Sequence, residues 1–304
     1  MMNKKLPLLL FILPLVGIFW VALNKNNLPV KTEPKNSSGV STSQTNLPTH
    51  PLVFFDKDTF YAGIEQSKKE NKSFANRVSG GIIPHHLFPG FIITDFFSRL
   101  AIQNPRTIIL IGPNHYERGE YKVLSSLYGW ETPFGVVEPK EQLIQELVKN
   151  KLIKIDEANL PKDHAVAGIM PFVKYYLPDT KVVPLLLSGF MTEEDIRMLS
   201  KSLSQYLTED TIIIAAVDFS HYLTNPQAQE KDKITSELMK SFDYKQMLSL
   251  NNEYLDSPPS IATLLMTMQS LGTTKMELLY HTNSGEMQKN NSVETTSYFS
   301  IAYY

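Results

Sequence analysis

Residues 107–115 read TIILIGPNH, an aliphatic and β-branched run that passes directly into glycine, proline, asparagine and histidine. A short apolar run closed by turn-forming residues predicts a strand that is buried on both faces of a sheet. Helix-like stretches, such as 192–207, separate four further runs of this kind: 80–83, 182–187, 211–216 and 276–280. This alternation predicts an α/β fold with a central, largely parallel mixed sheet and helices on both faces.

The histidines gather where the predicted strands end. Six of the seven histidines lie in the part of the chain expected to fold, and five of them directly follow a strand: His85, His86, His115, His221 and His281. Ligands of open α/β sheets bind beyond the carboxyl ends of the strands, so we expect a shared site there. Imidazole is a common metal ligand and a carboxylate adds a charge-balancing oxygen, so the site is predicted to hold a metal. Two histidines and one carboxylate suit non-haem Fe(II) best, with Zn(II) or Cu as alternatives.

The composition narrows the function classes. The 304 residues are 42% hydrophobic, which is enough for a substantial core. The formal net charge is only −2, so no nucleic-acid partner is expected. The chain has no cysteine, which excludes disulfides, zinc–thiolate sites and thiol catalysis. A G-x-S-x-G nucleophile elbow is also absent, which argues against a serine hydrolase built on Ser220.

The N-terminal residues predict a membrane location. Two lysines precede an unbroken run of apolar or small residues at 6–23, which as a helix would span about 27 Å, close to the hydrocarbon thickness of a bilayer. No convincing cleavage site follows, so residues 1–23 are expected to form an uncleaved signal anchor, a single-pass transmembrane helix with a cytoplasmic N-terminus. The remainder would then be extracytoplasmic. The alternative is a cleaved signal and a secreted protein.

The chain beyond this segment is expected to divide into two parts. Residues 24–51 are rich in Asn, Ser, Thr, Lys and Pro, which predicts a flexible polar linker in which His50 is solvated. Residues 52–304 carry all the predicted strands and are expected to form a single α/β domain.

Seven segments of the predicted domain form an ordered set of motifs: GGIIPHH (80–86), ILIGPNH (109–115), WETPFG (130–135), KDHAVAGIMPFVKYYLP (162–178), VVPLLLSG (182–189), AAVDFSHY (215–222) and LLYHTNSGE (278–286). In this order they resemble the motifs of the Memo family. The bacterial members of that family are labelled AmmeMemoRadiSam system protein B, and its fold is similar to that of the class III extradiol dioxygenases. The resemblance covers nearly all of the predicted domain and implies the dioxygenase-like fold.

The resemblance also implies roles for particular residues. His85 and His115 match the metal-site histidines of the family, and Glu286 falls where the dioxygenases place a glutamate ligand, so these three residues form the implied metal triad. Three further residues match polar positions of the family and are implied to orient ligands or to transfer protons as catalytic residues: Asp218, His221 and His164.

Two departures from the animal members concern the surroundings of this triad. His86-Leu87-Phe88 replaces a Gly-Tyr pair after the first histidine, and Asp256-Ser257-Pro258-Pro259 replaces a Cys-Gly-Arg-His loop. The residues and the resemblance together predict a metal-dependent, oxygenase-like or redox enzyme that acts on a small-molecule substrate. Two alternatives stay open, namely a non-catalytic protein that binds metal or a protein partner, and a zinc-dependent hydrolase.

Overall fold

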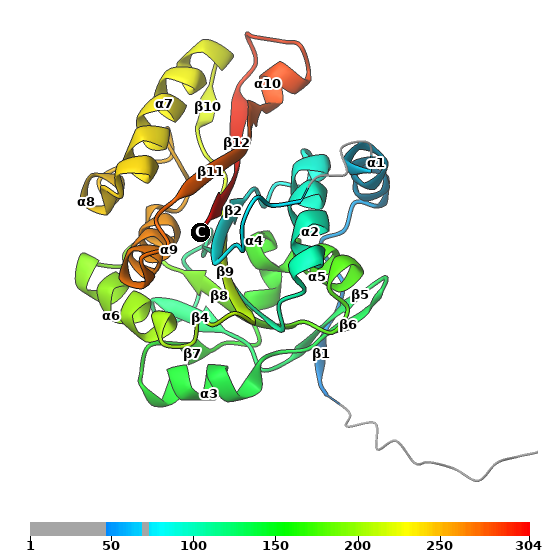
Figure 1. Cartoon of the computed structure of the whole chain (residues 1–304), viewed down its shortest axis with the longest axis vertical. Coiled ribbons are helices and arrows are strands. Elements are labelled where there is room, and N and C mark those ends of the chain that lie inside the picture. The colour runs from blue at the N-terminus through cyan, green and yellow to red at the C-terminus, as the bar shows by residue number, and fades with distance from the viewer. Residues whose placement is uncertain (1–46, 69–72) are drawn as a thin grey trace, which may run out of the picture. The chain divides into compact units, whose positions relative to one another are not determined.

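Four buried aliphatic strands form the centre of the sheet. The computed structural model describes residues 47–68 and 73–304 (Figure 1). The four strands pair in parallel in the order β2 (Gly80–Ile83), β9 (Thr211–Ala216), β3 (Thr107–Pro113) and β8 (Lys181–Leu187). Their carboxyl ends therefore meet at one edge of the sheet, as the sequence predicts.

Antiparallel strands extend this core on both sides. Next to β2 lies β12 (Thr295–Tyr303), which also pairs with β11 (Met276–Asn283) and with β10 (His221–Leu223). On the other side β8 pairs with β4 (Val123–Ser125), which pairs in turn with β7 (Lys154–Ile155). The result is the mixed sheet that the sequence predicts, with a parallel centre and antiparallel additions.

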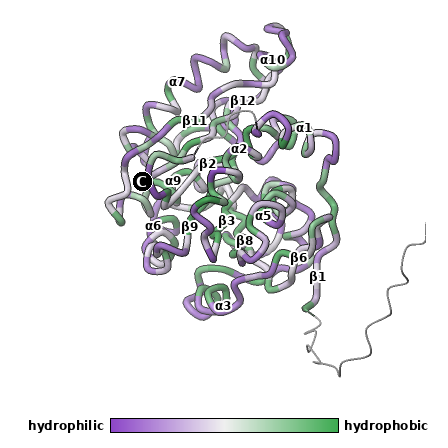
Figure 2. The backbone as a smooth tube through the Cα atoms, turned by 45° about the vertical axis from the view of Figure 1, so that its right-hand side comes forward, coloured by the Kyte–Doolittle hydropathy of each residue, from purple (hydrophilic) through white to green (hydrophobic). Residues whose placement is uncertain are grey.

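Alternate residues of the central strands pack against two separate layers of helices. In β3, Ile109 and Ile111 join one apolar cluster, whereas Ile108 and Leu110 join the other. The first cluster is covered by α3 (Glu141–Lys149), α6 (Glu193–Ser204), α7 (Asn225–Ser241), α8 (Tyr244–Met247) and α9 (Pro258–Leu271). The second is covered by α1 (Lys57–Ser67), α2 (Gly90–Gln103), the 3-10 turn η1 (Leu160–Lys162), α4 (His164–Ala167) and α5 (Met170–Tyr176). Because both faces are covered, every position of β3 is apolar or small. Hydrophobic colour accordingly gathers around β3 and β8, and hydrophilic colour runs along much of α7 (Figure 2).

The folded part includes residues that the sequence assigns to the linker. Thr49–His50 forms strand β1, which pairs in parallel with β5 (Gly129–Thr132), and β5 pairs with β6 (Gly135–Val137). The His50 side chain is buried, with its Nε2 atom 2.8 Å from Ser126 Oγ and 3.0 Å from a Glu157 carboxylate oxygen. The prediction that His50 is solvated is therefore wrong, because strand pairing and polar partners bury it.

The expectation of a membrane-anchored protein is corrected, because the described residues contain no membrane-spanning helix. A helix that crosses a bilayer needs about 20 mostly apolar residues. The longest helix within 47–68 and 73–304 is α7, which has 17 residues and a largely polar sequence, and no helix of these ranges is long and apolar enough to span a membrane. The predicted anchor at 1–23 lies outside the described residues, as does most of the predicted linker at 24–51.

Candidate metal centre

The carboxyl edge of the central strands brings together imidazole and carboxylate side chains. His85 follows β2, His115 follows β3 and Asp218 follows β9. Asp256 stands just before α9, whose first turn is capped by the Ser257 side chain. These side chains form two groups, each sharing His85, in which one donor atom per residue lies within 4.8 Å of the others: His85, His115 and His164 in one, and His85, Asp218 and Asp256 in the other.

His85 offers its Nε2 atom to the centre of this cluster. Its Nδ1 atom lies 3.1 Å from the carbonyl oxygen of Ala216, and because a carbonyl can only accept, Nδ1 carries the proton and Nε2 a free lone pair. Nε2 lies 3.2 Å from Asp256 Oδ2 and 3.6 Å from Asp218 Oδ2. Burial lowers the pKa of His85 well below its usual value, and His115 and His164 lower it further. The ring is thus held neutral, the form that binds metals.

His115 is held in place by Asp163. Its Nδ1 atom lies 2.8 Å from Asp163 Oδ1, and its backbone N–H donates to Asp163 Oδ2 at 2.8 Å. This contact leaves Nε2 facing the cluster, 3.7 Å from Asp256 Oδ2. Burial opposes protonation of His115, but Asp163 and Asp256 outweigh it and raise the pKa to about 10, so a metal that binds Nε2 would displace a proton from it. A carboxylate that orients the far nitrogen of an imidazole is a common arrangement behind metal ligands.

Asp256 is a buried carboxylate without a hydrogen-bonding partner. Its side chain is 7% exposed, and within the described part of the chain neither carboxylate oxygen accepts a hydrogen bond. Burial raises the pKa of this carboxyl group to about 7, and burial also raises the pKa of neighbouring Asp218. Burying a carboxylate without a partner costs free energy. A cation held between Asp256, His85 and His115 would supply the missing partner.

The solvent-facing side of the cluster is formed by two stacked imidazoles. The rings of His115 and His164 lie 4.4 Å apart at 15°. Their side chains are 23% and 36% exposed, compared with 1% for His85. Burial lowers the pKa of His164, and so does His115. A ligand reaching the cluster would therefore pass these two rings.

Two hollows border the cluster and differ in their lining. The larger, about 430 Å³, is lined by His85 and His164 together with mostly apolar and aromatic side chains: Phe54, Asp56, Thr59, His86, Leu87 and Phe88. The smaller, about 210 Å³, is lined by His115 and Asp256 together with mostly polar residues, among them Asn114, Glu117, Asn252 and Ser257. The cluster thus offers an apolar approach on one side and a polar one on the other.

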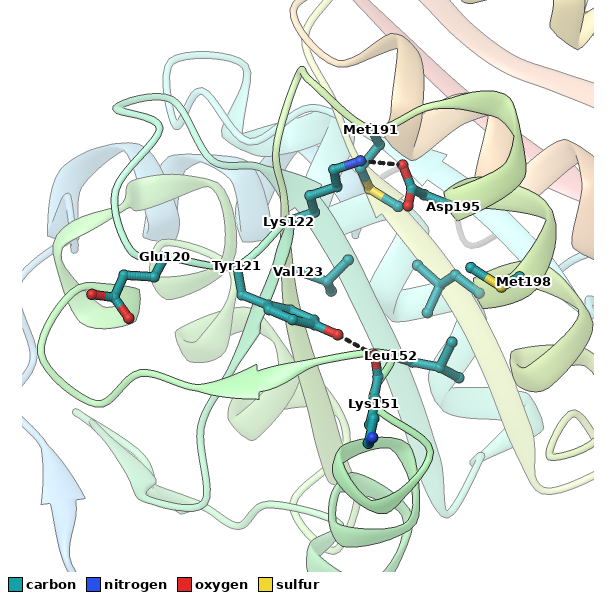
Figure 3. Close-up of a pocket in the computed structure, with 10 residues that line it drawn as sticks. Glu120, Tyr121, Lys122, Val123, Lys151, Leu152, Met191, Asp195 and Met198 are labelled. Atoms are coloured by element: carbon teal, nitrogen blue, oxygen red, sulfur yellow. Dashed lines mark hydrogen bonds and ion pairs between the residues drawn. The ribbon is translucent and has the colours of Figure 1, made fainter.

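A third hollow, of about 360 Å³, contains none of these residues (Figure 3). Lys122 and Asp195 form an ion pair at 2.6 Å, and the Tyr121 hydroxyl donates a hydrogen bond to the Lys151 carbonyl. Figure 3 marks both contacts with dashed lines. Apolar side chains also line this hollow, among them Val123, Leu152 and Leu199. No histidine lines this hollow, so we do not place the metal centre there.

The cluster includes most of the residues that the sequence singles out, but not all. His85, His115, His164 and Asp218 come together, whereas Glu286 belongs to neither group. Glu286 lies in α10 (Ser284–Met287), where its carboxylate accepts from Gln229 Nε2 at 3.1 Å and from Thr282 Oγ1 at 3.0 Å.

His221 and Asp256 also differ from the sequence-based expectation. His221 begins β10 and belongs to neither group, and its buried Nδ1 atom has no hydrogen-bonding partner in the described residues. Asp256 was not predicted as a site residue. One feature of the sequence could have indicated Asp256. It stands at the position of the cysteine in the Cys-Gly-Arg-His loop of animal members, and cysteine, like aspartate, can bind a metal.

Residues 57–301 match the family model described as "Memo-like protein". The chain belongs to this Memo family. Among its relatives, the "MEMO1 family protein PAE0818" of Pyrobaculum aerophilum is 28% identical over 74% of this chain and 83% of its own length. A "MEMO1 family protein" of Caldivirga maquilingensis is 26% identical over 78% of this chain and 86% of its own.

A solved structure supports the same fold for this Memo-family chain. The "uncharacterized protein JW3007" of Escherichia coli K12 superposes with a TM-score of 0.50 at 14% identity, over 73% of this chain and 99% of that one. At this identity the likeness concerns the fold alone. It agrees with the mixed α/β architecture expected from the resemblance to the dioxygenases.

Proposed function

We propose that this Memo-family protein binds a divalent metal ion through His85 Nε2, His115 Nε2 and a carboxylate oxygen of Asp256, and that it uses the metal in oxygenase-like or redox chemistry. The main support is the buried Asp256 carboxylate, which accepts no hydrogen bond from the described residues yet lies 3.2 and 3.7 Å from the two imidazole nitrogens. In this proposal Asp256 takes the place that the sequence assigned to Glu286.

The donor atoms favour Fe(II). Two imidazoles and one carboxylate, all on one side of an ion, form the facial arrangement typical of non-haem iron, and Zn(II) accepts the same donors. The absence of sulfur disfavours Cu(I), which prefers thiolate or thioether ligands. A bound Fe(II) would supply open coordination positions and one-electron redox chemistry.

The surrounding residues would hold the ligands and serve a substrate. The Ala216 carbonyl and the Asp163 carboxylate fix the two imidazoles so that both Nε2 atoms face the same point. Asp218 accepts a hydrogen bond from the His85 backbone N–H at 3.1 Å and so orients that segment. His164, which lines the larger hollow and is kept neutral by burial, would accept a proton from a substrate bound there. The catalytic role of His221 stays a prediction.

Metal content measured on protein prepared without oxygen tests the ligand set. We expect one equivalent of metal in the wild type, and strong loss in His115→Ala and in Asp256→Ala. Glu286→Gln provides the matched control, because it changes the carboxylate that the sequence favoured. Retention of metal by Asp256→Ala together with loss from Glu286→Gln would refute the proposed triad.

Oxygen consumption then tests the chemistry. The iron-loaded protein should consume oxygen when supplied with an oxidisable substrate such as a catechol, and the zinc-loaded protein should not. A protein that takes up only zinc, and consumes no oxygen in any metal form, would rule out the oxygenase-like function. That result would leave the zinc-dependent hydrolase or a non-catalytic metalloprotein.

A further inference from the structure

The loop from Asp218 to His221 supports two of the proposed ligands. The Asp218 carboxylate accepts a hydrogen bond from the backbone N–H of His85, and the Asp218 carbonyl accepts one from the backbone N–H of Asp256 at 3.1 Å. A shift of this loop would therefore move both ligand-bearing segments. The contacts that hold this loop on the side away from His85 and Asp256 therefore determine how well the metal centre is preorganised.

A series of hydrogen-bonded side chains, here called the polar chain, connects Ser220 of this loop to Asp232 and His281. Asp232, a fully buried residue in the middle of α7, accepts a hydrogen bond from Ser220 Oγ at 2.6 Å. Its other carboxylate oxygen lies 2.8 Å from Nε2 of His281 on β11. Since a carboxylate accepts, the proton of this contact belongs to the imidazole. A buried carboxylate with two partners fixes both of them.

An apolar chain runs beside the polar one. The His281 ring stacks on Phe299 at 4.3 Å and 20°, and Phe299 packs edge-on against Phe219 at 4.5 Å. Phe219 and Ser220 are the two buried residues between Asp218 and His221. His281 is thus connected to the interior of the same loop by both routes, through Asp232 and through Phe299, although its own side chain is 30% exposed.

We propose that His281 and Asp232 are positioning residues of the metal centre, which hold the 218–221 loop in the geometry that aligns His85 and Asp256. This inference rests on the proposed function. It also gives a role to the LLYHTNSGE segment (278–286), which contributes no side chain to the cluster itself.

Two variants cut the polar chain at different points and leave the apolar chain in place. His281→Phe keeps a ring against Phe299 and removes one of the two partners of Asp232, and Ser220→Ala removes only the hydroxyl that joins Asp232 to the loop. We expect each to weaken Co(II) binding by about tenfold, the lower end of the range for groups behind metal ligands, and to change the visible absorption spectrum of bound Co(II). The double variant should be little worse than either single one, because both act through Asp232.

Glu157→Gln is the matched control. It breaks a second contact among a carboxylate, a histidine and a serine, formed by the partly buried Glu157 with His50 and Ser126 beside strand β1 and away from the 218–221 loop. It should lower stability and leave the Co(II) affinity and spectrum unchanged. A change of the Co(II) spectrum in this control as large as in His281→Phe would overturn the inference, since general destabilisation would then explain both.

Hydrogen exchange of the metal-free protein gives an independent readout. Exchange at 217–221 and 255–256 should be faster in His281→Phe and Ser220→Ala, and unchanged in Glu157→Gln. Folded variants that bind Co(II) within twofold of the wild type, with its spectrum, would overturn the inference. A wild type that binds no Co(II) would refute the proposed function, and hydrogen exchange would then decide the inference. Unchanged exchange of the loop in His281→Phe and Ser220→Ala would overturn it, and faster exchange confined to residues 217–221 and 255–256 would support it.

Discussion

Replacing Asp256 with asparagine should stabilise the metal-free protein while abolishing its metal binding. The substitution keeps the size of the side chain and removes a buried charge that has no hydrogen-bonding partner in the described residues. Burial raises the pKa of Asp256 from an ordinary 3.8 to about 7. The folded state therefore holds a proton between these two pH values that the unfolded state has released.

The pKa difference sets the sign and size of the effect. Stability falls with pH wherever the folded state binds more protons than the unfolded state, so the wild type loses stability from about pH 4 to pH 7. At about 1.4 kcal/mol per pH unit, the difference corresponds to at most about 4 kcal/mol above pH 7. The asparagine side chain has no charge to bury, so the variant avoids this loss. The gain would raise Tm by up to about 10 °C.

Urea unfolding in the presence of a chelator measures the difference. Wild type and Asp256→Asn should have similar stability near pH 4 and diverge as the pH rises to 8, with the variant the more stable. Metal at 1,000 times its Kd should remove the variant's advantage, because such a ligand stabilises the wild type by about 4.1 kcal/mol and leaves the variant unchanged. If the variant is less stable than the wild type at pH 8 with chelator present, Asp256 has a structural partner and the reasoning is refuted.

Three other variants test the surroundings of the site. Asp163→Asn should weaken metal binding by roughly 10- to 100-fold in calorimetric titration, because His115 loses the carboxylate that orients it; an unchanged Kd would contradict this. Asp256→Cys replaces a hard oxygen with a soft sulfur and should raise the affinity for Cu(I) relative to Zn(II), measured by competition with a chromophoric chelator. Burial alone would raise the pKa of Glu157, but bonds from His50, Ser126 and the Leu127 N–H lower it. The stabilisation that Glu157 contributes is therefore present above its ordinary pKa of 4.5 and lost as the pH falls through the lowered pKa. Glu157→Gln should lower the free energy of unfolding by about 1–3 kcal/mol at pH 7 and by less near pH 3, as measured by denaturant unfolding.

The sequence predicts the parts of this protein that local pattern determines. The strand at 107–113 is evident because every residue in it is apolar or small, and His85 and His115 are evident because each follows such a strand. Parallel strands place their carboxyl ends together, so the meeting of these two histidines follows from strand direction alone.

The remaining parts depend on contacts between distant segments. Asp256 precedes a helix, and it reaches the cluster because the loop before α9 pairs with the segment after β9, through the bridge between Leu255 and Phe219. His50 lies in a stretch of polar composition, and its burial requires β5, about 80 residues further along the chain. Neither contact leaves a periodic pattern in the sequence.

The two-faced burial of β3 has a consequence for strand alignment. A one-residue slip of a strand exchanges its faces, and in β3 the exchange would place aliphatic side chains where aliphatic side chains already stand. Burial alone therefore distinguishes poorly between neighbouring alignments of this strand. The distinction is made at its end, where the Asn114 N–H donates to the Leu187 carbonyl and Asp163 binds both the backbone and the ring of His115. The polar residues proposed to serve chemistry thus also select the register of this strand.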